Sequence, residues 1–168
     1  RVALYTLGCK VNSYETDRIR ETFQSEGATI VPFTEPADVY VVNTCTVTQM
    51  AAKKSRQILH RARRLNTEAL IVATGCFVQT GRDGMPAGPV DLYVSNAVKS
   101  QLVQRVNDAM RDRKLLNDSI QAPEEEMKHT RAFLKIQDGC RQYCSYCIIP
   151  YVRGPLQSRD PEDILAEV

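Results

Sequence analysis

The sequence contains no tryptophan and only two histidines, His60 and His129, which leaves few imidazoles for a metal site. It also lacks an apolar run near the ~18 residues that a membrane-spanning helix needs, and it has no basic start followed by an apolar segment, as a signal peptide has. We therefore expect a cytoplasmic protein with no membrane partner. Because the chain begins at Arg1 instead of methionine, a removed leader stays an alternative.

What the sequence does have is a balanced composition over 168 residues, with 43% hydrophobic and 25% charged residues. That is enough for one substantial core and part of a second. Strands are predicted at residues 2–7, 28–33, 38–43, 70–74 and 92–95, and helices at 13–26, 47–65 and 98–113. Alternation of this kind favours parallel strands joined by right-handed crossovers. We therefore predict an α/β fold, an open and mostly parallel five-stranded sheet with helices on both faces, Rossmann-like in type.

One connection departs from this alternation. Residues 80–91 are rich in glycine and proline, and we expect a short turn or a mobile flap there in place of a helix.

Three of the predicted strands run into a cysteine, in "VALYTLGC", "DVYVVNTC" and "LIVATGC", at Cys9, Cys45 and Cys76. Ligands of open α/β sheets bind outside the carboxyl ends of the strands, so these thiols are expected to converge at one edge. Separate core thiols are the alternative, because free cysteine is often buried. Repetition at the same place favours one ligand site. Asn12 and Asn43 lie close by in sequence, as supports of that site or as turn formers.

A basic stretch occupies residues 53–64, where six basic residues occur without one acidic residue: Lys53, Lys54, Arg56, Arg61, Arg63 and Arg64. The apolar spacing predicts a helix with the basic groups mostly outside its buried side. A solvated face is one interpretation. An RNA contact is the other, since clustered Lys and Arg neutralise phosphates and release counterions. The helix alone does not decide between them.

A second set of cysteines follows a strand predicted at residues 132–137: Cys140, Cys144 and Cys147. The spacing Cys-x-x-x-Cys-x-x-Cys lets one loop wrap a single ion or cluster. Three disulfides are an alternative, although nothing supports export. Zinc is another, although structural zinc normally takes four ligands and each set offers three. Thiolates hold iron–sulfur clusters, and a three-cysteine set leaves one iron open.

The segment "GCRQYCSYCIIPYVRG" resembles the signature loop of the radical S-adenosylmethionine enzymes. The resemblance implies that its three cysteines ligate a 4Fe–4S cluster whose open iron chelates S-adenosylmethionine. One electron from such a cluster cleaves that molecule to a 5′-deoxyadenosyl radical. Tyr146 would lie near the adenine, or would equally serve as a packing residue over the cluster.

Nearly the whole chain is similar to the methylthiotransferases, through "TLGCKVNSYET", "NTCTV", "TGC" and "KIQDGC". In that family an N-terminal α/β domain holds a second, auxiliary 4Fe–4S cluster through three separated cysteines, which here are Cys9, Cys45 and Cys76. Sulfur reaches the substrate carbon through that cluster, and a second S-adenosylmethionine supplies the methyl group. The resemblance therefore implies two 4Fe–4S clusters, S-adenosylmethionine, an electron donor and a sulfur source.

The pieces "PADVYVVNTCTVT", "KKSRQ" and "TRAFLKIQDGC" most resemble the branch that acts on threonylcarbamoyladenosine in tRNA. That branch implies methylthiolation of carbon 2 of N6-threonylcarbamoyladenosine at tRNA position 37. The alternatives are the branches that act on isopentenyladenosine in tRNA or on a ribosomal protein. Two further alternatives are not methylthiotransferases. One is a noncatalytic iron–sulfur protein that binds RNA or senses redox state, and the other is a zinc-stabilised binding module.

We divide the chain into an N-terminal α/β domain at residues 1–114, a linker at 115–130 and the start of a radical S-adenosylmethionine domain at 131–168. Asp160 and Pro161 open a helix just as the sequence ends. We therefore expect a piece of a longer enzyme, which carries the first βα unit of a truncated (βα) barrel and is inactive by itself.

Overall fold

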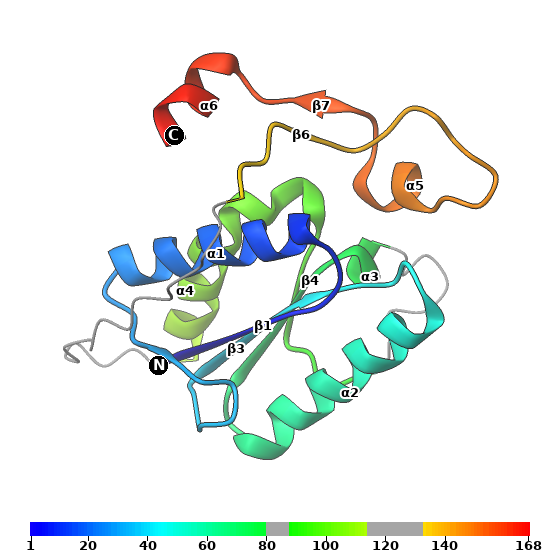
Figure 1. Ribbon diagram of the computed structural model, residues 1–168. Coiled ribbons are helices and arrows are strands. Elements are labelled where there is room, and N and C mark those ends of the chain that lie inside the picture. The colour runs from blue at the N-terminus through cyan, green and yellow to red at the C-terminus, as the bar shows by residue number, and fades with distance from the viewer. Residues whose placement is uncertain (80–87, 114–132) are drawn as a thin grey trace.

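A parallel sheet of five strands forms the centre of the computed structural model, which describes residues 1–79, 88–113 and 133–168 (Figure 1). Its order is β2-β1-β3-β4-β5, and every neighbouring pair is parallel. The strands are β1 (Val2–Thr6), β2 (Ile30–Val31), β3 (Val39–Thr44), β4 (Leu70–Gly75) and β5 (Leu92–Val94). Every residue of β3 and β4 is buried, as their continuous apolar runs indicate for central strands. The predicted open parallel sheet is confirmed.

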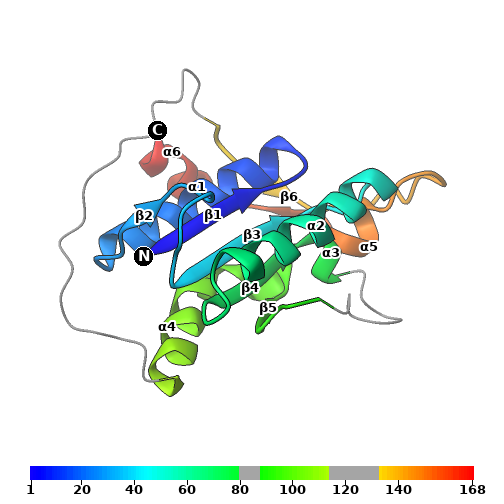
Figure 2. The same ribbon diagram turned by 90° about the horizontal axis from the view of Figure 1, so that it is seen from below.

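Helices cover both faces of this sheet, with α1 and α4 on one side and α2 on the other (Figures 1 and 2). On one face, Ile58 and Leu59 of α2 join a buried cluster with alternate side chains of β3 and β4. On the opposite face, Phe23 of α1 and Val106 of α4 pack on the other alternate set. The helices are α1 (Lys10–Ser25), α2 (Gln49–Leu65), α3 (Cys76–Gln79), the 3-10 helix η2 (Asn96–Gln101) and α4 (Leu102–Asp112).

The C-terminal segment lies across α1 and reaches α3 (Figures 1 and 2). It contains β6 (Gln137–Asp138), α5 (Ile149–Arg153), β7 (Gln157–Ser158) and α6 (Pro161–Glu167). β6 and β7 pair with each other in antiparallel orientation. The segment therefore covers one end of the sheet and adds no strand to it.

The strand order places a topological switch point between β1 and β3. From β1 the chain crosses to β2 on one side, whereas β3, β4 and β5 follow on the other side. In doubly wound sheets of this order, ligands bind outside the carboxyl ends of the two strands at the switch point. The loops after β1 and β3 are therefore the expected floor of a binding site.

Several predicted boundaries differ from the observed ones. α1 begins at Lys10 instead of residue 13, and the helix predicted at 98–113 is divided into η2 and α4, with non-helical backbone at Val98. Cys76 opens the short helix α3, which was not predicted. The strand predicted at 132–137 is only Gln137–Asp138 and pairs with a strand 20 residues later, and no closed barrel forms among the described residues.

Two predicted features lie largely outside the described residues. The linker at 115–130 falls wholly there, and so does most of the connection at 80–91, of which residues 88–91 are described. The division into domains stays a prediction. None of the described helices combines the length and the apolar character needed to cross a membrane.

Gly75 at the end of β4 provides a test of how tightly the strand ends are packed. Its φ is +95°, and a Cβ there would overlap the carbonyl oxygen of Thr44 in β3. We expect Gly75→Ala to lower the free energy of unfolding by about 3 kcal/mol, from left-handed strain and overlap together. Urea denaturation monitored by circular dichroism measures it.

Gly27 is the matched control, because its φ is +83° but a Cβ added there would meet nothing within 4 Å. Gly27→Ala should lower the free energy of unfolding by about 1 kcal/mol, from the strain of the left-handed backbone alone. Equal losses in the two variants would contradict the close approach of β3 and β4 at this point.

Candidate functional site

Three cysteines follow neighbouring strands at the carboxyl edge of the sheet, and we call them the edge cysteines: Cys9, Cys45 and Cys76. Cys9 is the N-cap residue of α1, Cys45 directly follows β3, and Cys76 directly follows β4. Cys45 and Cys76 are 5% and 2% exposed, whereas Cys9 is exposed. A Cβ on Gly8 would lie 2.8 Å from the Cys45 Sγ, so the turn that carries Cys9 passes directly against Cys45. The edge therefore presents two buried thiols and one that faces solvent.

Positive charge surrounds the most buried of these thiols. Burial raises the pKa of Cys76, and the charges of Arg153 and Lys99 oppose that rise. Cys45 and Cys9 also raise the pKa of Cys76, so both lie within electrostatic reach of that thiol. A negatively charged thiolate at Cys76 therefore has two cations to offset it.

The edge cysteines offer three thiols, and thiolates are the protein ligands that an iron–sulfur cluster takes. Within residues 1–79, 88–113 and 133–168, no three His, Cys, Asp or Glu side chains stand close enough to hold a metal ion by themselves. Three thiols do not complete the four ligands of structural zinc. A cluster is wider than an ion because it carries several iron and sulfide atoms, and it takes thiolates as its protein ligands.

A second group, the loop cysteines, lies between β6 and α5: Cys140, Cys144 and Cys147. The N–H of Cys140 donates to the carbonyl of Gly154 at 3.1 Å, so the start of this loop is joined to the residue that follows α5. Cys144 is exposed and the other two are half-buried. Tyr146 is 91% exposed, and its place beside S-adenosylmethionine stays a prediction.

All six cysteines lie in described parts of the chain, and all six are free. The three-disulfide alternative is therefore wrong. The thiols remain free to act as ligands.

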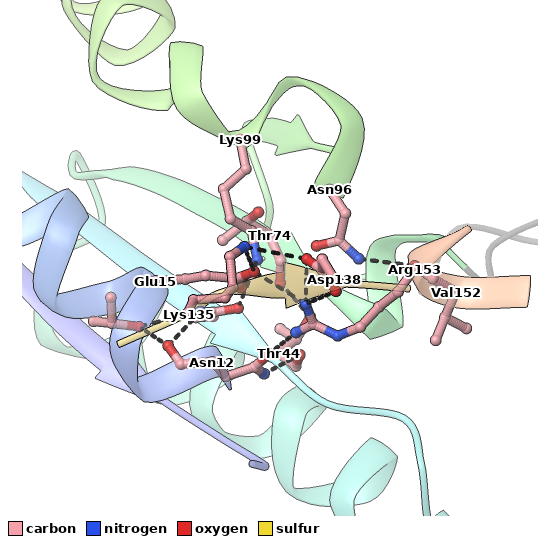
Figure 3. A network of polar contacts seen from close by, with 12 residues as sticks. Asn12, Glu15, Thr44, Thr74, Asn96, Lys99, Lys135, Asp138, Val152 and Arg153 are labelled. Atoms are coloured by element: carbon pink, nitrogen blue, oxygen red, sulfur yellow. Dashed lines mark hydrogen bonds and ion pairs between the residues drawn. The ribbon is translucent and has the colours of Figure 1, made fainter. Parts of the chain in front are cut away.

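Arg153 joins the two parts of the structure (Figure 3). It ends α5, and its side chain is only 4% exposed. Its Nη1 donates to Glu15 of α1 and to Asp138 of β6, each at 3.0 Å. Its Nη2 donates to the Asn12 Oδ1 at 2.5 Å. One guanidinium therefore bonds to α1 and to the strand that leads into the loop cysteines.

Glu15 is the buried anion at the centre of this network (Figure 3). Besides its bond with Arg153, Glu15 forms ion pairs with Lys99 of η2 at 2.6 Å and with Lys135 at 3.2 Å. Burial raises the pKa of Glu15, but Lys99 and Arg153 outweigh it and hold that pKa at about 2. Burial lowers the pKa of Lys99, and Glu15 opposes this. The carboxylate is thus ionised across the physiological range.

Asn12 and Asn43 are fully buried and bond to the strand ends. The Asn12 Nδ2 donates to the carbonyls of Leu7 and Thr44, at 2.6 and 3.1 Å. The Asn43 Nδ2 donates to the Asn12 carbonyl at 3.0 Å and to the Thr16 Oγ1 at 3.1 Å. Both side chains therefore bond to buried groups at the strand ends and in α1, and their role as supports of a ligand site stays a prediction.

The basic stretch lies on α2, on the side of the sheet opposite to α1 and α4 (Figure 1). Arg63 is partly buried, pairs with Asp91 at 2.6 Å and donates to the carbonyl of Ala69, so it fastens the helix to the fold. The guanidinium of Arg56 stands over the ring of Phe77 at 5.8 Å. Five of the six basic residues are exposed: Lys53, Lys54, Arg56, Arg61 and Arg64.

The charged network was missed by sequence reasoning. Its members are Glu15, Lys99, Lys135, Asp138 and Arg153. One signal was present: Glu15 lies four residues before Ile19, on the buried side of α1, where a carboxylate needs partners. The partners themselves come from segments far along the chain and leave no local pattern.

Comparison with known proteins identifies the family. Residues 1–95 match the uncharacterized protein family UPF0004. The chain belongs to this family. The match includes the whole sheet and all three edge cysteines.

Relatives extend the similarity into the C-terminal segment. The chain is 41% identical to the threonylcarbamoyladenosine tRNA methylthiotransferase MtaB of Bacillus subtilis, over 99% of the chain and 39% of that protein. It is 38% identical to the MtaB of Aquifex aeolicus, over 100% and 44%. It is 36% identical to the tRNA-2-methylthio-N(6)-dimethylallyladenosine synthase of Anaplasma marginale, over 96% and 38%. The expected resemblance to methylthiotransferases is confirmed, and the chain spans about two fifths of the length of these relatives.

The low pKa of Glu15 predicts how the free energy of unfolding depends on pH. Its folded-state pKa of about 2 lies below its ordinary value of 4.5, so its contribution is complete above pH 4.5 and is lost as the pH falls toward 2. That lowering corresponds to about 3 kcal/mol. We expect Glu15→Gln to be less stable than the native chain by this amount at pH 7. The gap should narrow by roughly 2 kcal/mol by pH 3, as measured by urea denaturation at each pH.

Glu21 gives the control, because its ion pair is with Arg18 at the surface, with both side chains more than half exposed. Glu21→Gln should change the stability by less than ~0.5 kcal/mol at every pH. A Glu15→Gln gap that is the same at pH 7 and pH 3 would contradict the assigned pKa.

Proposed function

We propose that the chain is part of a tRNA methylthiotransferase that modifies carbon 2 of N6-threonylcarbamoyladenosine at tRNA position 37. The observation that carries this proposal is the contact between two helices that adjoin the two cysteine groups. α5, which closely follows the loop cysteines, packs against α3, which begins with Cys76. The MtaB relatives, aligned over the whole chain, support this substrate.

In this proposal the edge cysteines hold one 4Fe–4S cluster and the loop cysteines hold another, each through thiolates. When bound, these clusters supply the electron that cleaves S-adenosylmethionine and an open iron for the sulfur that is inserted. The chain's own residues do the rest. The buried strand ends exclude water around Cys45 and Cys76, and Arg153 and Lys99 offset thiolate charge. Tyr146 is exposed beside the last loop cysteine, where its ring would stack on an adenine.

The proposal also names partners and a location. tRNA is the substrate, and an electron donor and a sulfur source act with the enzyme. The cytoplasm is the expected compartment, because six free thiols suit a reducing environment.

A second candidate keeps the chemistry and changes the base. The relative from Anaplasma marginale is named for dimethylallyladenosine, and it aligns over 96% of the chain. Nucleoside analysis separates the two, because each modified adenosine has its own mass.

The two cysteine groups are expected to fail in different ways in the full-length protein. Cys144→Ala should abolish the cleavage of S-adenosylmethionine and the product together. Cys76→Ala should keep cleavage and lose the methylthio product, because only the auxiliary site is damaged. Mass spectrometry of 5′-deoxyadenosine and of tRNA nucleosides, with reductant and tRNA bearing threonylcarbamoyladenosine, measures both.

Ser145→Ala is the control, since Ser145 is an exposed neighbour in the same loop with no thiol. It should retain both activities. Product from Cys76→Ala, or native cleavage by Cys144→Ala, would overturn the assignment. Anaerobic loading of the 168-residue chain that gives zinc and no sulfide would overturn the iron–sulfur proposal itself.

α2 is proposed as an RNA-facing surface because its exposed basic residues have no acidic neighbours on the helix. A variant with four of them changed to glutamine should bind tRNA more weakly: Lys53, Lys54, Arg61 and Arg64. The slope of log affinity against log salt should fall by roughly 0.7–0.9 for each phosphate contact that is lost. Filter binding across a salt series measures it.

The control replaces Arg105 and Arg111, which are exposed on α4 at the opposite face of the sheet. Their loss should leave the slope nearly unchanged. A solvated helix face, the competing interpretation of α2, predicts the same small change for both variants.

A further inference from the structure

The structure contains a polar connection between the two cysteine groups that the proposed chemistry does not by itself require. It begins at the edge, where Asn12 bonds to the carbonyl of Thr44, the residue before Cys45. The Asn12 side chain also donates to the carbonyl of Leu7, two residues before Cys9. Asn12 therefore holds the backbone next to two of the three edge cysteines.

The connection continues through Arg153. Its Nη2 donates to the Asn12 Oδ1 at 2.5 Å, and its Nη1 donates to both carboxylate oxygens of Asp138 at 3.0 Å. Asp138 lies two residues before Cys140, and its Oδ1 accepts from the N–H of Gly139 at 2.8 Å. A single buried guanidinium thus links the backbone at the edge with the backbone at the start of the loop (Figure 3).

The attraction between the two parts has other sources as well. Val152 is 1% exposed, and its carbonyl accepts from the Asn96 Nδ2 at 2.8 Å. Arg159 of the segment donates to the Tyr14 hydroxyl of α1 at 3.0 Å and pairs, within the segment, with Glu167 at 2.6 Å. The bonds to Asn96 of η2 and to Tyr14 of α1 attach the segment to the rest of the fold, and neither involves a cysteine.

Arg153 differs from these contacts because its side chain bonds next to both cysteine groups and because its hydrogen bonds are strongly directional. Apolar burial is non-directional, whereas a planar guanidinium bonds only in the geometry of its fork. A buried ion pair contributes more to a single arrangement than to net stability in some proteins. Here that arrangement is the position of one set of thiols relative to the other.

We propose that Arg153 is a positioning residue that, through Asn12 and Asp138, fixes the distance and orientation of the loop cysteines relative to the edge cysteines. The importance of that distance rests on the proposed function. The geometry of Arg153 does not depend on it. Loss of the fork should leave the segment bound to α1 but free to adopt several orientations.

The test measures this distance in the metal-free 168-residue chain. Nitroxide labels go on Cys9 and Cys144, which are both exposed and belong to different groups. The other four cysteines are changed to alanine in every sample. Pulsed dipolar spectroscopy then gives the distribution of label distances, and hydrogen exchange of peptides from β3, β4 and β6 reports on folding.

With Arg153 in place, we expect one narrow distribution of the distance between the two labels. Arg153→Gln should broaden this distribution and speed exchange at the backbone amide of residue 140, which is alanine in these samples, by about tenfold, with exchange in β3 and β4 unchanged. Arg153→Lys keeps the charge but has one donor nitrogen, which cannot bond to Asn12 and Asp138 as the fork does. It should give an intermediate width.

Arg18→Gln is the matched control, since Arg18 lies on α1, which the segment crosses, and its ion pair is with Glu21 at the surface. It should reproduce the native distribution. A native width in both Arg153 variants overturns the proposal. If Arg153→Gln also speeds hydrogen exchange in β3 and β4, the Arg153→Lys variant decides. A broad label distribution in that variant, with native exchange in the sheet, supports the proposal. A native distribution width in that variant overturns it.

The outcome is distinguishable from failure of the proposed function. If the full-length protein does not make the methylthio product, the label distances still show whether Arg153 sets the separation. If the enzyme is active but the distances do not change, only the role of Arg153 is lost.

Discussion

The buried carboxylate of Glu15 is the charge on which the arrangement of the described chain depends. It is 8% exposed and receives Lys99 from η2, Lys135 from the segment before β6, and Arg153 from α5. A buried ion without partners is strongly unfavourable. Each of these three segments must therefore be in place for α1 to keep its carboxylate inside. The network selects one arrangement, and burial of apolar side chains supplies most of the stability.

α1 carries this constraint to the edge of the sheet. Cys9 is its N-cap residue, and Asn12 and Glu15 follow at intervals of three residues, which places successive members of this series next to one another on the helix. The loop after β1 also lies at the topological switch point, where a doubly wound sheet opens a crevice. One of the edge cysteines, the asparagine that bonds to the strand ends and the central carboxylate thus all belong to one helix or its cap. A shift of α1 would move all three together.

The pattern of the sequence predicted the parts that depend on local periodicity and on topology. Continuous apolar runs predicted β3 and β4, and their cysteines fell at one edge because parallel strands share that edge. The start of α1 was misplaced because Cys9 caps the helix without a side-chain hydrogen bond, so the usual Ser, Thr, Asp or Asn signal is absent there. β6 was misplaced because its ladder joins residues about 20 positions apart. Arg153 was read only as part of a motif, since its partners lie 15 to 141 positions away.

The charges of the network are better explained by the thiols than by the carboxylates alone. Three cations, Lys99, Lys135 and Arg153, face two carboxylates, Glu15 and Asp138, so one positive charge is in excess. Two of these cations act on Cys76, whose pKa burial would otherwise raise further. Neutral thiols leave this excess charge unbalanced, whereas thiolates bound to the proposed cluster would offset it. An apolar edge would have excluded water equally well but would have opposed the ionised ligands that a cluster needs. On the proposed function, the positive charge would favour the binding of thiolates, and the guanidinium of Arg153 that supplies part of it is also the one proposed to orient the loop cysteines.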